Sequence, residues 1–410
     1  MDSKERVKTS LNHLEPDRVP IFELSINNKV SSDILGRATF IGGGLSYKNS
    51  IIANMGTQDD LRKNFQVYFG DTLELYKKAE LDIVWLKIQK CLTPVFPSLG
   101  NIGALGVFDI KIREIDKNRF RVEGEEDFWS ESFYDVERTK GFYNTKDCIK
   151  EKGIKELERY VKYLENKTKD IPYQIQIGLD EYKKAINSSV GKNLFIAGFS
   201  DVLFPTFSPF LEVFMEAMIT NPDLAHRYME ITTEGVLILL KKQIEAGVDG
   251  IIGANDIASQ KGTIISPKHY KEFILPSLKK IVNKCHSKNI PFIKHYDGNI
   301  NMILDTLIDE GRIDGLHSIE PVADMDIYNI KKIYGNKITL LGNLDCSYLM
   351  SFGSKDEIEK EVKRLIKYIA PGGGYVFSSS NAIHSGISSE TFNFIRKKVL
   401  EYGQYPINLN

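Results

Sequence analysis

The chain has 410 residues, of which 42% are hydrophobic and 27% are charged, as in ordinary soluble globular proteins. Lys and Arg number 54 against 55 Asp and Glu, so the formal net charge of −1 gives no electrostatic case for nucleic acid or an anionic membrane as the main partner. The four cysteines are far apart and form no CxxC pair, so we expect neither a disulfide framework nor a zinc ribbon.

The amino-terminal part predicts a short helical extension followed by a first strand. Residues 3–14 have the pattern of a helix that stops before Pro16, and residues 18–24 form the strand candidate. The charged terminus lacks the apolar core of a signal peptide, and no stretch is long and apolar enough to cross a membrane. Together with the cysteine usage, these features predict a cytoplasmic protein.

The next segments predict a loop, a helix and a second strand. Residues 28–60 show little periodicity and contain three consecutive glycines, which favours a loop over one end of the fold. Residues 61–79 have apolar side chains at helical spacing. Residues 82–87 then supply a short apolar run that is typical of a buried strand.

From about residue 91 to residue 143 the pattern changes to alternation. Residues 107–113 and 119–122 alternate on either side of an Asp-Lys-Asn turn at 116–118, which predicts a β-hairpin insertion. Residues 147–166 are strongly charged at helical spacing. This run is more typical of a solvated helix face than of a binding patch.

The remaining chain alternates regularly between helices and short apolar strands. The predicted strands lie at 193–199, 250–254, 291–296, 315–320, 337–342 and 375–380. The predicted helices lie at 209–219, 222–246, 267–288, 299–311, 325–334, 354–370 and 388–402.

The strand count predicts the fold class. Eight short strands with crossover-length connections favour a parallel sheet closed as a TIM (β/α)8 barrel, which we expect to form a single domain over residues 1–410. A doubly wound open sheet is the alternative. It has little support, because no Gly-rich dinucleotide fingerprint follows a strand and the glycines at 372–374 precede theirs.

Polar residues gather where the predicted strands end, which is where a barrel of this kind has its active site. The residues found there are Glu23, Asn255, Asp256, His295, Asp297, Glu320, Asn343, Asp345 and Asn381. His295 and Asp297 are two positions apart, so on an extended chain they point the same way and form either a two-ligand metal arm or an acid–base pair. The structural alternative is a satisfied strand-end histidine and a turn-forming aspartate.

Imidazole and carboxylate together suit zinc or another divalent ion with an open position. We predict His295 and Asp297 as catalytic residues and metal ligands, completed by Glu320 or Cys346. Cys346 is either a soft ligand or a packed small apolar group. A cluster without metal would instead bind a donor-rich substrate such as pyrrole N–H groups.

Six further residues are predicted to orient a substrate, namely Asp82, Asn255, Asp256, Asn343, Asp345 and Asn381. Asp82 precedes the apolar run of its strand, so it enters the site only if that strand begins later than its residues suggest. Asn343 and Asn381 have the alternative of forming turns, and Glu320 has the alternative of capping the next element. His317 lies within a strand and is expected to be a core histidine.

Several stretches together resemble the uroporphyrinogen decarboxylase superfamily, a group of TIM barrels. They are Pro16-Asp17-Arg18-Val19-Pro20, residues 255–260, Ile265-Ser266-Pro267, residues 295–299, residues 342–345, residues 372–375 and residues 380–383, in the family's order. The insertion at 91–143 is not accounted for by this resemblance. The decarboxylases carry an Arg- and Gly-rich stretch after the Arg-Val-Pro, whereas residues 21–29 of this chain contain no arginine.

The other branch of the superfamily, the cobamide-dependent methyltransferases, binds zinc through His-x-Cys and a later Cys. This chain has His295-x-Asp297 at the first motif and Asn381 at the last cysteine. The resemblance implies a methyltransferase that moves a methyl group between a small-molecule donor or acceptor and a corrinoid on a partner protein, with a homodimer as one option. The alternatives are a uroporphyrinogen decarboxylase, in which Asp82 would hold pyrrole N–H groups, and a non-catalytic tetrapyrrole or corrinoid binder.

Overall fold

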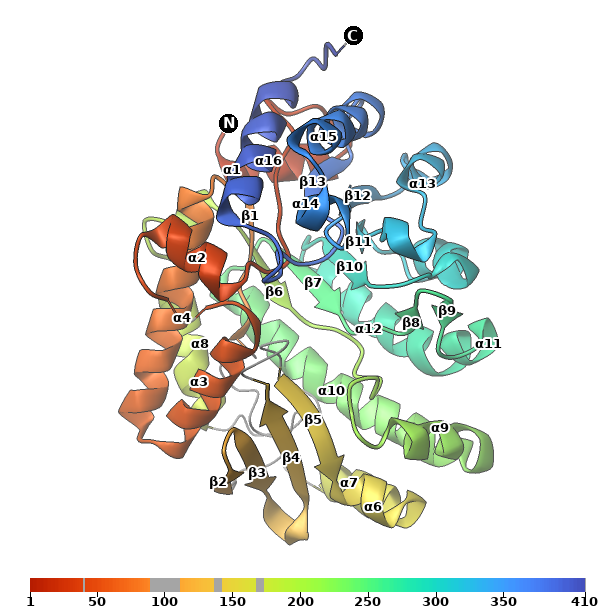
Figure 1. Ribbon diagram of the computed structural model, residues 1–410. Coiled ribbons are helices and arrows are strands. Elements are labelled where there is room, and N and C mark those ends of the chain that lie inside the picture. The colour runs from red at the N-terminus through yellow and green to blue at the C-terminus, as the bar shows by residue number, and fades with distance from the viewer. Residues whose placement is uncertain (40, 89–110, 136–141, 167–172, 410) are drawn as a thin grey trace.

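A computed structural model describes residues 1–39, 41–88, 111–135, 142–166 and 173–409. Its central sheet is entirely parallel, in the order β1-β6-β7-β10-β11-β12-β13 (Figure 1). The strands of this sheet are β1 (Ile83–Trp85), β6 (Phe195–Phe199), β7 (Gly250–Ala254), β10 (Phe292–Tyr296), β11 (Gly315–Ser318), β12 (Thr339–Leu344) and β13 (Tyr375–Ser379). A two-stranded ribbon, β8 (Ala258–Ser259) with β9 (Gly262–Thr263), follows β7.

Residues 21 and 22 close the sheet into a barrel. Ile21 pairs in parallel with Phe377 of β13, and Phe22 pairs in parallel with Ile83 of β1. These pairings join the two edges of the seven-stranded sheet, so the predicted first strand lies between β13 and β1 as the eighth strand of the barrel. The predicted TIM barrel is confirmed, with all eight strands where the sequence pattern put them.

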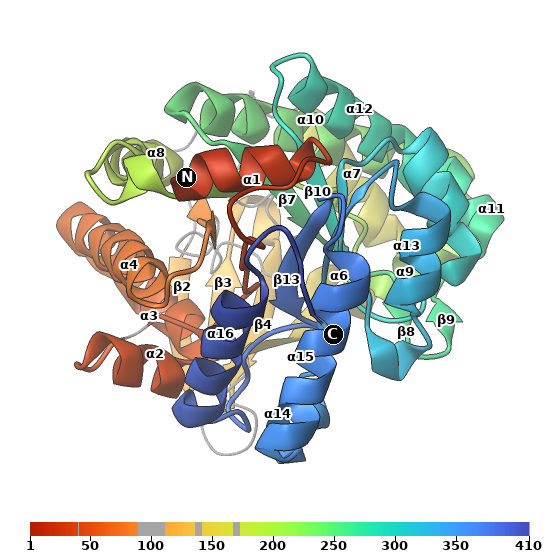
Figure 2. The same cartoon turned by 90° about the horizontal axis from the view of Figure 1, so that it is seen from above.

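The interior of the barrel is filled by side chains that alternate along the strands. They include Phe22, Ile83, Trp85, Phe195, Ala197, Ile252, Ile293, Leu341 and Val376. The alternation that turns Ile293 inward also turns His295 inward, two positions nearer the carboxyl end of β10. Val7 of α1 (Ser3–Leu11) joins this cluster at the amino-terminal end of the barrel, across which α1 lies in Figure 2.

Helices surround the barrel and cover the outward faces of its strands (Figure 2). The helices that follow α1, apart from the two in the insertion, are α2 (Asn28–Leu35), α3 (Gly43–Met55), α4 (Gln58–Lys78), α8 (Tyr173–Ile186), α9 (Leu211–Thr220), α10 (Pro222–Ala246), α11 (Pro267–His269), α12 (Leu275–His286), α13 (Ile327–Tyr334), α14 (Leu349–Phe352), α15 (Lys355–Ile369) and α16 (Ser389–Tyr402). In the described part of the chain, no helix combines the length and hydrophobicity that a membrane span requires.

Of two local predictions, one was wrong and one is confirmed. The expected loop at 28–60 contains α2 and α3, and α2 begins at an Asn27 cap and ends at Gly36, whose φ is 71°. Short helices of this kind are stabilised mainly by packing against neighbouring helices, so their own sequences show little helical periodicity. The predicted helix at 299–311 is confirmed over residues 301–310, where it runs without a break from a 3-10 turn, Asn301–Ile303, into a π-helical turn, Thr306–Glu310.

The insertion is larger than a hairpin. It is a four-stranded antiparallel sheet of β2 (Lys111–Asp116), β3 (Arg119–Glu123), β4 (Trp129–Tyr134) and β5 (Phe142–Asp147), followed by α6 (Cys148–Lys152) and α7 (Ile154–Asn166). The predicted hairpin is β2 with β3, whereas β4 and β5 were not predicted as strands. The predicted part before residue 111 lies outside the described residues, and the observed sheet runs beyond 143.

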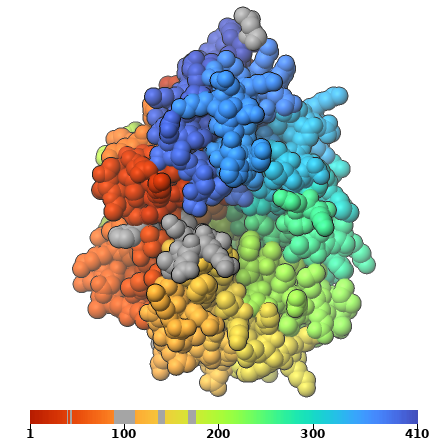
Figure 3. Space-filling model, in the orientation of Figure 1, coloured from red at the N-terminus to blue at the C-terminus, as the bar shows by residue number. Residues whose placement is uncertain are grey.

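The insertion sheet lies on the carboxyl-end side of the barrel. Asn144 of β5 donates from Nδ2 to the backbone carbonyl of Phe207, in the segment that follows β6, at 3.2 Å. Figure 3 shows the insertion, in gold and yellow, forming one end of the molecule, with the blue carboxyl-terminal helices at the other end. The sheet therefore stands next to the barrel end at which strand-end side chains collect.

Candidate metal centre

The candidate site is built on the carboxyl end of β10. His295 points into the barrel, is buried, and directs Nε2 toward two carboxylates. Asp297 Oδ1 lies 3.4 Å from this nitrogen, and Oδ1 of Asp256, from the segment after β7, lies 3.8 Å from it. One ligand atom from each of the three residues lies within 4.8 Å of the other two.

Register explains why Asp256 belongs to this group. β7 and β10 pair in parallel so that His295 stands beside Ala254, and Asp256 follows two residues later. The backbone N–H of Asp297 donates to Asp256 Oδ1 at 2.9 Å, which ties the two strand ends together. The sequence predicted Asp256 for substrate binding, whereas the geometry puts it among the candidate metal ligands.

Asp297 is held in place by two side chains from other strand ends. Ser318 Oγ donates to Oδ1 at 3.1 Å, and Asn381 Nδ2 donates to Oδ2 at 2.7 Å. Burial raises the pKa of Asp297, the positive charge of His295 lowers it, and the carboxylate of Asp256 raises it again. A second carboxylate close to a buried one is unfavourable unless a cation lies between them, so this arrangement favours a bound positive ion.

Glu320 stands beside this group but outside the three-residue set. The backbone N–H of Gly298 donates to its Oε2 at 2.7 Å. Burial, and secondly the negative charge of Asp297, raise the pKa of Glu320. Its predicted role as a metal ligand stays a prediction, since the structure places it next to the cluster with one oxygen already occupied by a backbone donor.

Cys346 lies outside the three-residue group among the described residues, and its predicted role as a metal ligand stays a prediction. Its thiol is buried and accepts a hydrogen bond from Ser380 Oγ at 3.5 Å. Burial raises the pKa of this thiol to about 11, which favours the neutral thiol when no metal is bound. This buried environment agrees with the packed small group that the sequence offered as its alternative.

The side chains of three predicted substrate-binding residues form hydrogen bonds with backbone groups in the segments that follow the strands. Asn255 Nδ2 donates to the carbonyls of Val202 and Phe204 at 2.9 and 2.7 Å. Asn343 Nδ2 donates to the backbone carbonyl of Ile319, which follows β11, at 2.7 Å. Asp345 accepts from the backbone N–H groups that begin α14. Substrate binding by these residues stays a prediction.

Asp82 is not part of the site. It precedes β1, at the amino-terminal end of the barrel, and is fully buried in contact with Arg6 and Arg18, both at 2.7 Å. Its carboxylate also accepts the backbone N–H of Ile21 at 2.8 Å. The prediction that Asp82 binds substrate is therefore corrected, because the strand does begin after it, as its apolar run suggested.

The sequence reasoning missed two buried groups near the site. His317 of β11 was expected to be an ordinary core histidine, but its Nδ1 lies 2.7 Å from Nδ1 of His295. Burial, and secondly the charge of His295, lower the pKa of His317, which keeps the ring neutral. Lys294 and Asp201 form a buried ion pair on the outward side of β10. The sequence contained a signal for this pair, because Lys294 lies within a buried apolar strand, where a charged side chain needs a buried partner of opposite charge.

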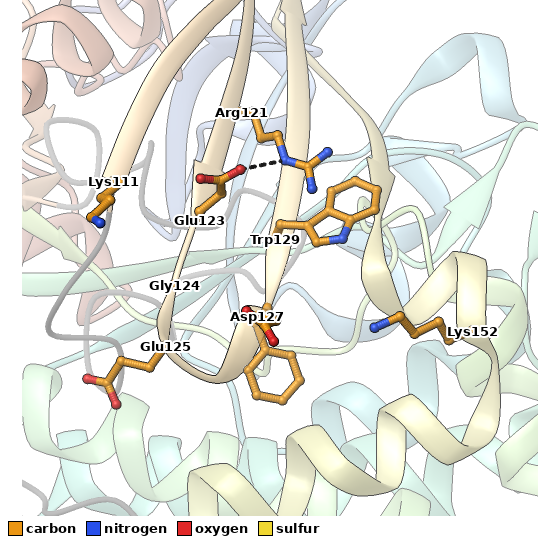
Figure 4. A pocket seen from close by; sticks show the side chains of 9 residues that line it. Lys111, Arg121, Glu123, Gly124, Glu125, Asp127, Trp129 and Lys152 are labelled. Carbon is orange, nitrogen blue, oxygen red and sulfur yellow. Dashed lines mark hydrogen bonds and ion pairs between the residues drawn. The ribbon is translucent and has the colours of Figure 1, made fainter.

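A separate hollow lies on the insertion sheet (Figure 4). Its lining includes Arg121, whose guanidinium lies 4.0 Å from the ring centroid of Trp129 and bonds to Glu123 at 3.0 Å. Lys111 and Lys152 stand at its sides. Because Arg121 is already paired with acids of its own sheet, this hollow offers a balanced set of charges and shares no residue with the barrel site.

Comparison with known proteins agrees with the barrel and with its strand-end motifs. Residues 205–402 match the family described as uroporphyrinogen decarboxylase (URO-D). A uroporphyrinogen decarboxylase from Hydrogenovibrio crunogenus is 29% identical over 188 residues, which are 45% of this chain and 50% of that protein. The methylcobamide:CoM methyltransferase MtaA from Methanosarcina barkeri is 28% identical over 197 residues, 47% of this chain and 56% of that protein.

The matched region is only part of these relatives, since the chain spans about half the length of the curated proteins it matches. A solved structure of a methyltransferase from Methanosarcina mazei is similar over 98% of this chain and 99% of its own, with a TM-score of 0.63 and 21% identity. That likeness shows the fold. Residues 205–402 therefore match the uroporphyrinogen decarboxylase family, and the proteins similar to this part of the chain include both decarboxylases and a methyltransferase.

Proposed function

We propose that this protein is a corrinoid-dependent methyltransferase that moves a methyl group between a small molecule and a corrinoid carried by a separate protein. The observation that carries the proposal is the convergence of Asp256, His295 and Asp297 at the carboxyl end of the barrel. The similarity to a methylcobamide:CoM methyltransferase supports methyl transfer as the reaction class. The activity, its substrates and its partner are all part of this proposal.

The donor set fits a divalent ion. One imidazole nitrogen and two carboxylate oxygens form a borderline-hard set, which suits zinc or another divalent metal better than an all-thiolate site would. In this proposal Asp256 takes the place in the ligand set that the sequence gave to Glu320 or Cys346. When bound, such an ion acts as a Lewis acid that lowers the pKa of a substrate heteroatom or polarises its bond to a methyl group.

The surrounding residues hold the ligands in position before any substrate arrives. Ser318 and Asn381 each donate to one oxygen of Asp297, so that carboxylate has little freedom to rotate. Supporting hydrogen bonds of this kind typically strengthen metal binding. Glu320, whose pKa is raised by burial, stands beside them and can hold a proton for a substrate heteroatom.

A uroporphyrinogen decarboxylase is the second candidate, favoured by the family match and by decarboxylase relatives such as that of Hydrogenovibrio crunogenus. Against it stands the composition of residues 21–29, which contain no arginine. A substrate with several carboxylates would lack guanidinium partners in that segment. Asp82, the residue that would hold pyrrole N–H groups, is bound to Arg6 and Arg18 at the opposite end of the barrel.

Metal content tests the first part of the proposal. Wild type, His295→Ala and His226→Ala are purified without chelator, loaded with zinc and dialysed. His226 is the matched control because it is exposed on α10, where its nearest charged partner is Glu272. We expect one divalent ion per chain in wild type and in the control, and loss of that ion in His295→Ala. A metal-free wild type after loading contradicts the proposal.

Turnover distinguishes the two enzymes and the non-catalytic alternative. With methylcobalamin and a panel of thiol, amine and hydroxyl acceptors, we expect demethylation of the corrinoid, visible in its absorption spectrum, that depends on His295. With uroporphyrinogen we expect no release of CO2. Release of CO2 would identify the decarboxylase, and binding of either compound without turnover would identify a tetrapyrrole or corrinoid binder.

A further inference from the structure

Two imidazoles face each other inside the barrel. β10 and β11 pair in parallel so that His295 stands beside His317, and their Nδ1 atoms lie 2.7 Å apart. On its other side, His317 Nε2 lies 3.1 Å from Ser378 Oγ of β13. His317 is 0% exposed, and the ring of Phe22 packs edge-on against it with the centroids 5.4 Å apart.

The short distance between the two Nδ1 atoms restricts where the hydrogens are. Only one hydrogen fits between them, so one ring donates and the other accepts. Nε2 of His295 faces Asp256 and Asp297, so it is the nitrogen whose lone pair is placed to bind a cation between them. That lone pair is free when the ring carries its hydrogen at Nδ1, and His317 stands where it can accept this hydrogen.

His317 has what this role requires. A neutral ring that accepts at Nδ1 must carry its own hydrogen at Nε2, and the hydroxyl of Ser378, 3.1 Å away, can accept that hydrogen. The fully buried position, with an aromatic ring against it, disfavours a charged imidazole that would donate from both nitrogens.

We propose that His317 is a positioning residue that accepts the Nδ1 hydrogen of His295, and so fixes the tautomer in which Nε2 of His295 binds the metal. The inference rests on the proposed metal function. It assigns a role to a histidine that makes no contact with the ion itself. A hydrogen bond that orients a ligating imidazole in this way typically changes metal affinity by about 10- to 100-fold.

Two variants of His317 and one spectroscopic measurement test the proposal. His317→Phe keeps a ring against Phe22 but removes the acceptor, whereas His317→Asn retains an acceptor oxygen near the former Nδ1. We expect zinc affinity, measured by competition with a chelator, to fall about 10- to 100-fold in His317→Phe and to recover largely in His317→Asn. Equal affinity of His317→Phe and wild type, with the fold intact by circular dichroism, overturns the proposal.

The hydrogen itself is observed by 15N NMR of histidine-labelled wild type, with His295 assigned from the spectrum of His295→Gln. We expect a protonated Nδ1 on His295 both without and with zinc. A bare Nδ1 in either state overturns the inference. This readout separates the two proposals, because a wild type that binds no zinc refutes the metal function, while the Nδ1 measurement in metal-free protein judges the imidazole pair by itself.

Discussion

Replacing Asp82 by Asn is expected to destabilise the barrel without weakening the metal site. The carboxylate accepts from Ser3 Oγ at 2.8 Å, from Arg6 Nη1 at 2.7 Å and from the backbone N–H of Ile21 at 2.8 Å. Arg18 adds two more bonds, from Nη1 at 2.7 Å and from Nη2 at 3.1 Å. The amino-terminal helix, the first barrel strand and β1 therefore meet on one buried anion.

The expected loss follows from what Asn would leave behind. Asp82 is 0% exposed, and the side chains of Arg6 and Arg18 are 9% and 15% exposed, so two guanidinium groups would lose a buried counter-charge. Breaking such a pair from one side costs about 3–5 kcal/mol. Arg6 keeps Asp17, at 2.6 Å, so we expect a value near the lower limit, about 3 kcal/mol.

Urea unfolding, followed by tryptophan fluorescence and by circular dichroism, measures this loss. Asp17→Asn is the matched control, because Asp17 also binds Arg6 but is 39% exposed, and we expect a loss of about 1 kcal/mol or less. Zinc affinity should be unchanged in both variants. The reasoning fails if Asp82→Asn unfolds within about 0.5 kcal/mol of wild type, or if it loses zinc as His295→Ala does.

Three further changes probe other buried groups. Burial raises the pKa of Glu23 to about 8 against an ordinary value of 4.5, so the carboxyl of the unfolded chain loses its proton at lower pH than that of the folded chain. As the pH rises from 4.5 to 8, the free energy of unfolding of wild type should therefore fall, by at most about 1.4 kcal/mol per pH unit, relative to that of Glu23→Gln in urea titrations. Lys294→Met leaves Asp201 as an unpaired buried carboxylate and should cost about 3–5 kcal/mol by the same measurement, part of which Lys294→Met/Asp201→Asn should restore. Asn381→Ala removes the 2.7 Å donor to Asp297 and should weaken zinc binding about tenfold in chelator competition; unchanged affinity would show that the amide does not support that carboxylate.

The barrel could be predicted because each of its strands is a short apolar run that ends at a polar residue. Burial on both faces imposes that pattern, so it survives in the sequence without reference to any partner. The helices α2 and α3 could not be predicted in the same way, because short helices depend on tertiary packing. Strand β4 of the insertion was missed because two of its three buried positions are serines, Ser130 and Ser132, so its sequence shows no apolar alternation.

The candidate site was predictable as far as one strand determines it. His295 and Asp297 lie together because they are two positions apart on β10, whereas Asp256 joins them through the pairing of β7 with β10, which the sequence does not display. The same limit explains why the role of Asp82 was mispredicted. The sequence does not show that Arg6 and Arg18 reach this carboxylate at the amino-terminal end of β1. Each error concerns a contact between segments that are distant in the sequence.

The two departures from the methyltransferase motif are linked by one hydrogen bond. The resemblance puts Asp297 and Asn381 where the family has cysteine ligands, and in this structure Asn381 Nδ2 donates to Asp297 Oδ2 at 2.7 Å. A hydrogen bond to one oxygen of a carboxylate orients the other oxygen. In the proposed metal centre, Asn381 therefore supports the ligand Asp297 instead of binding the ion, and Asp256 supplies the third donor. Restoring cysteine at position 297 alone would leave the Asn381 amide without its acceptor, so the two positions are expected to change together.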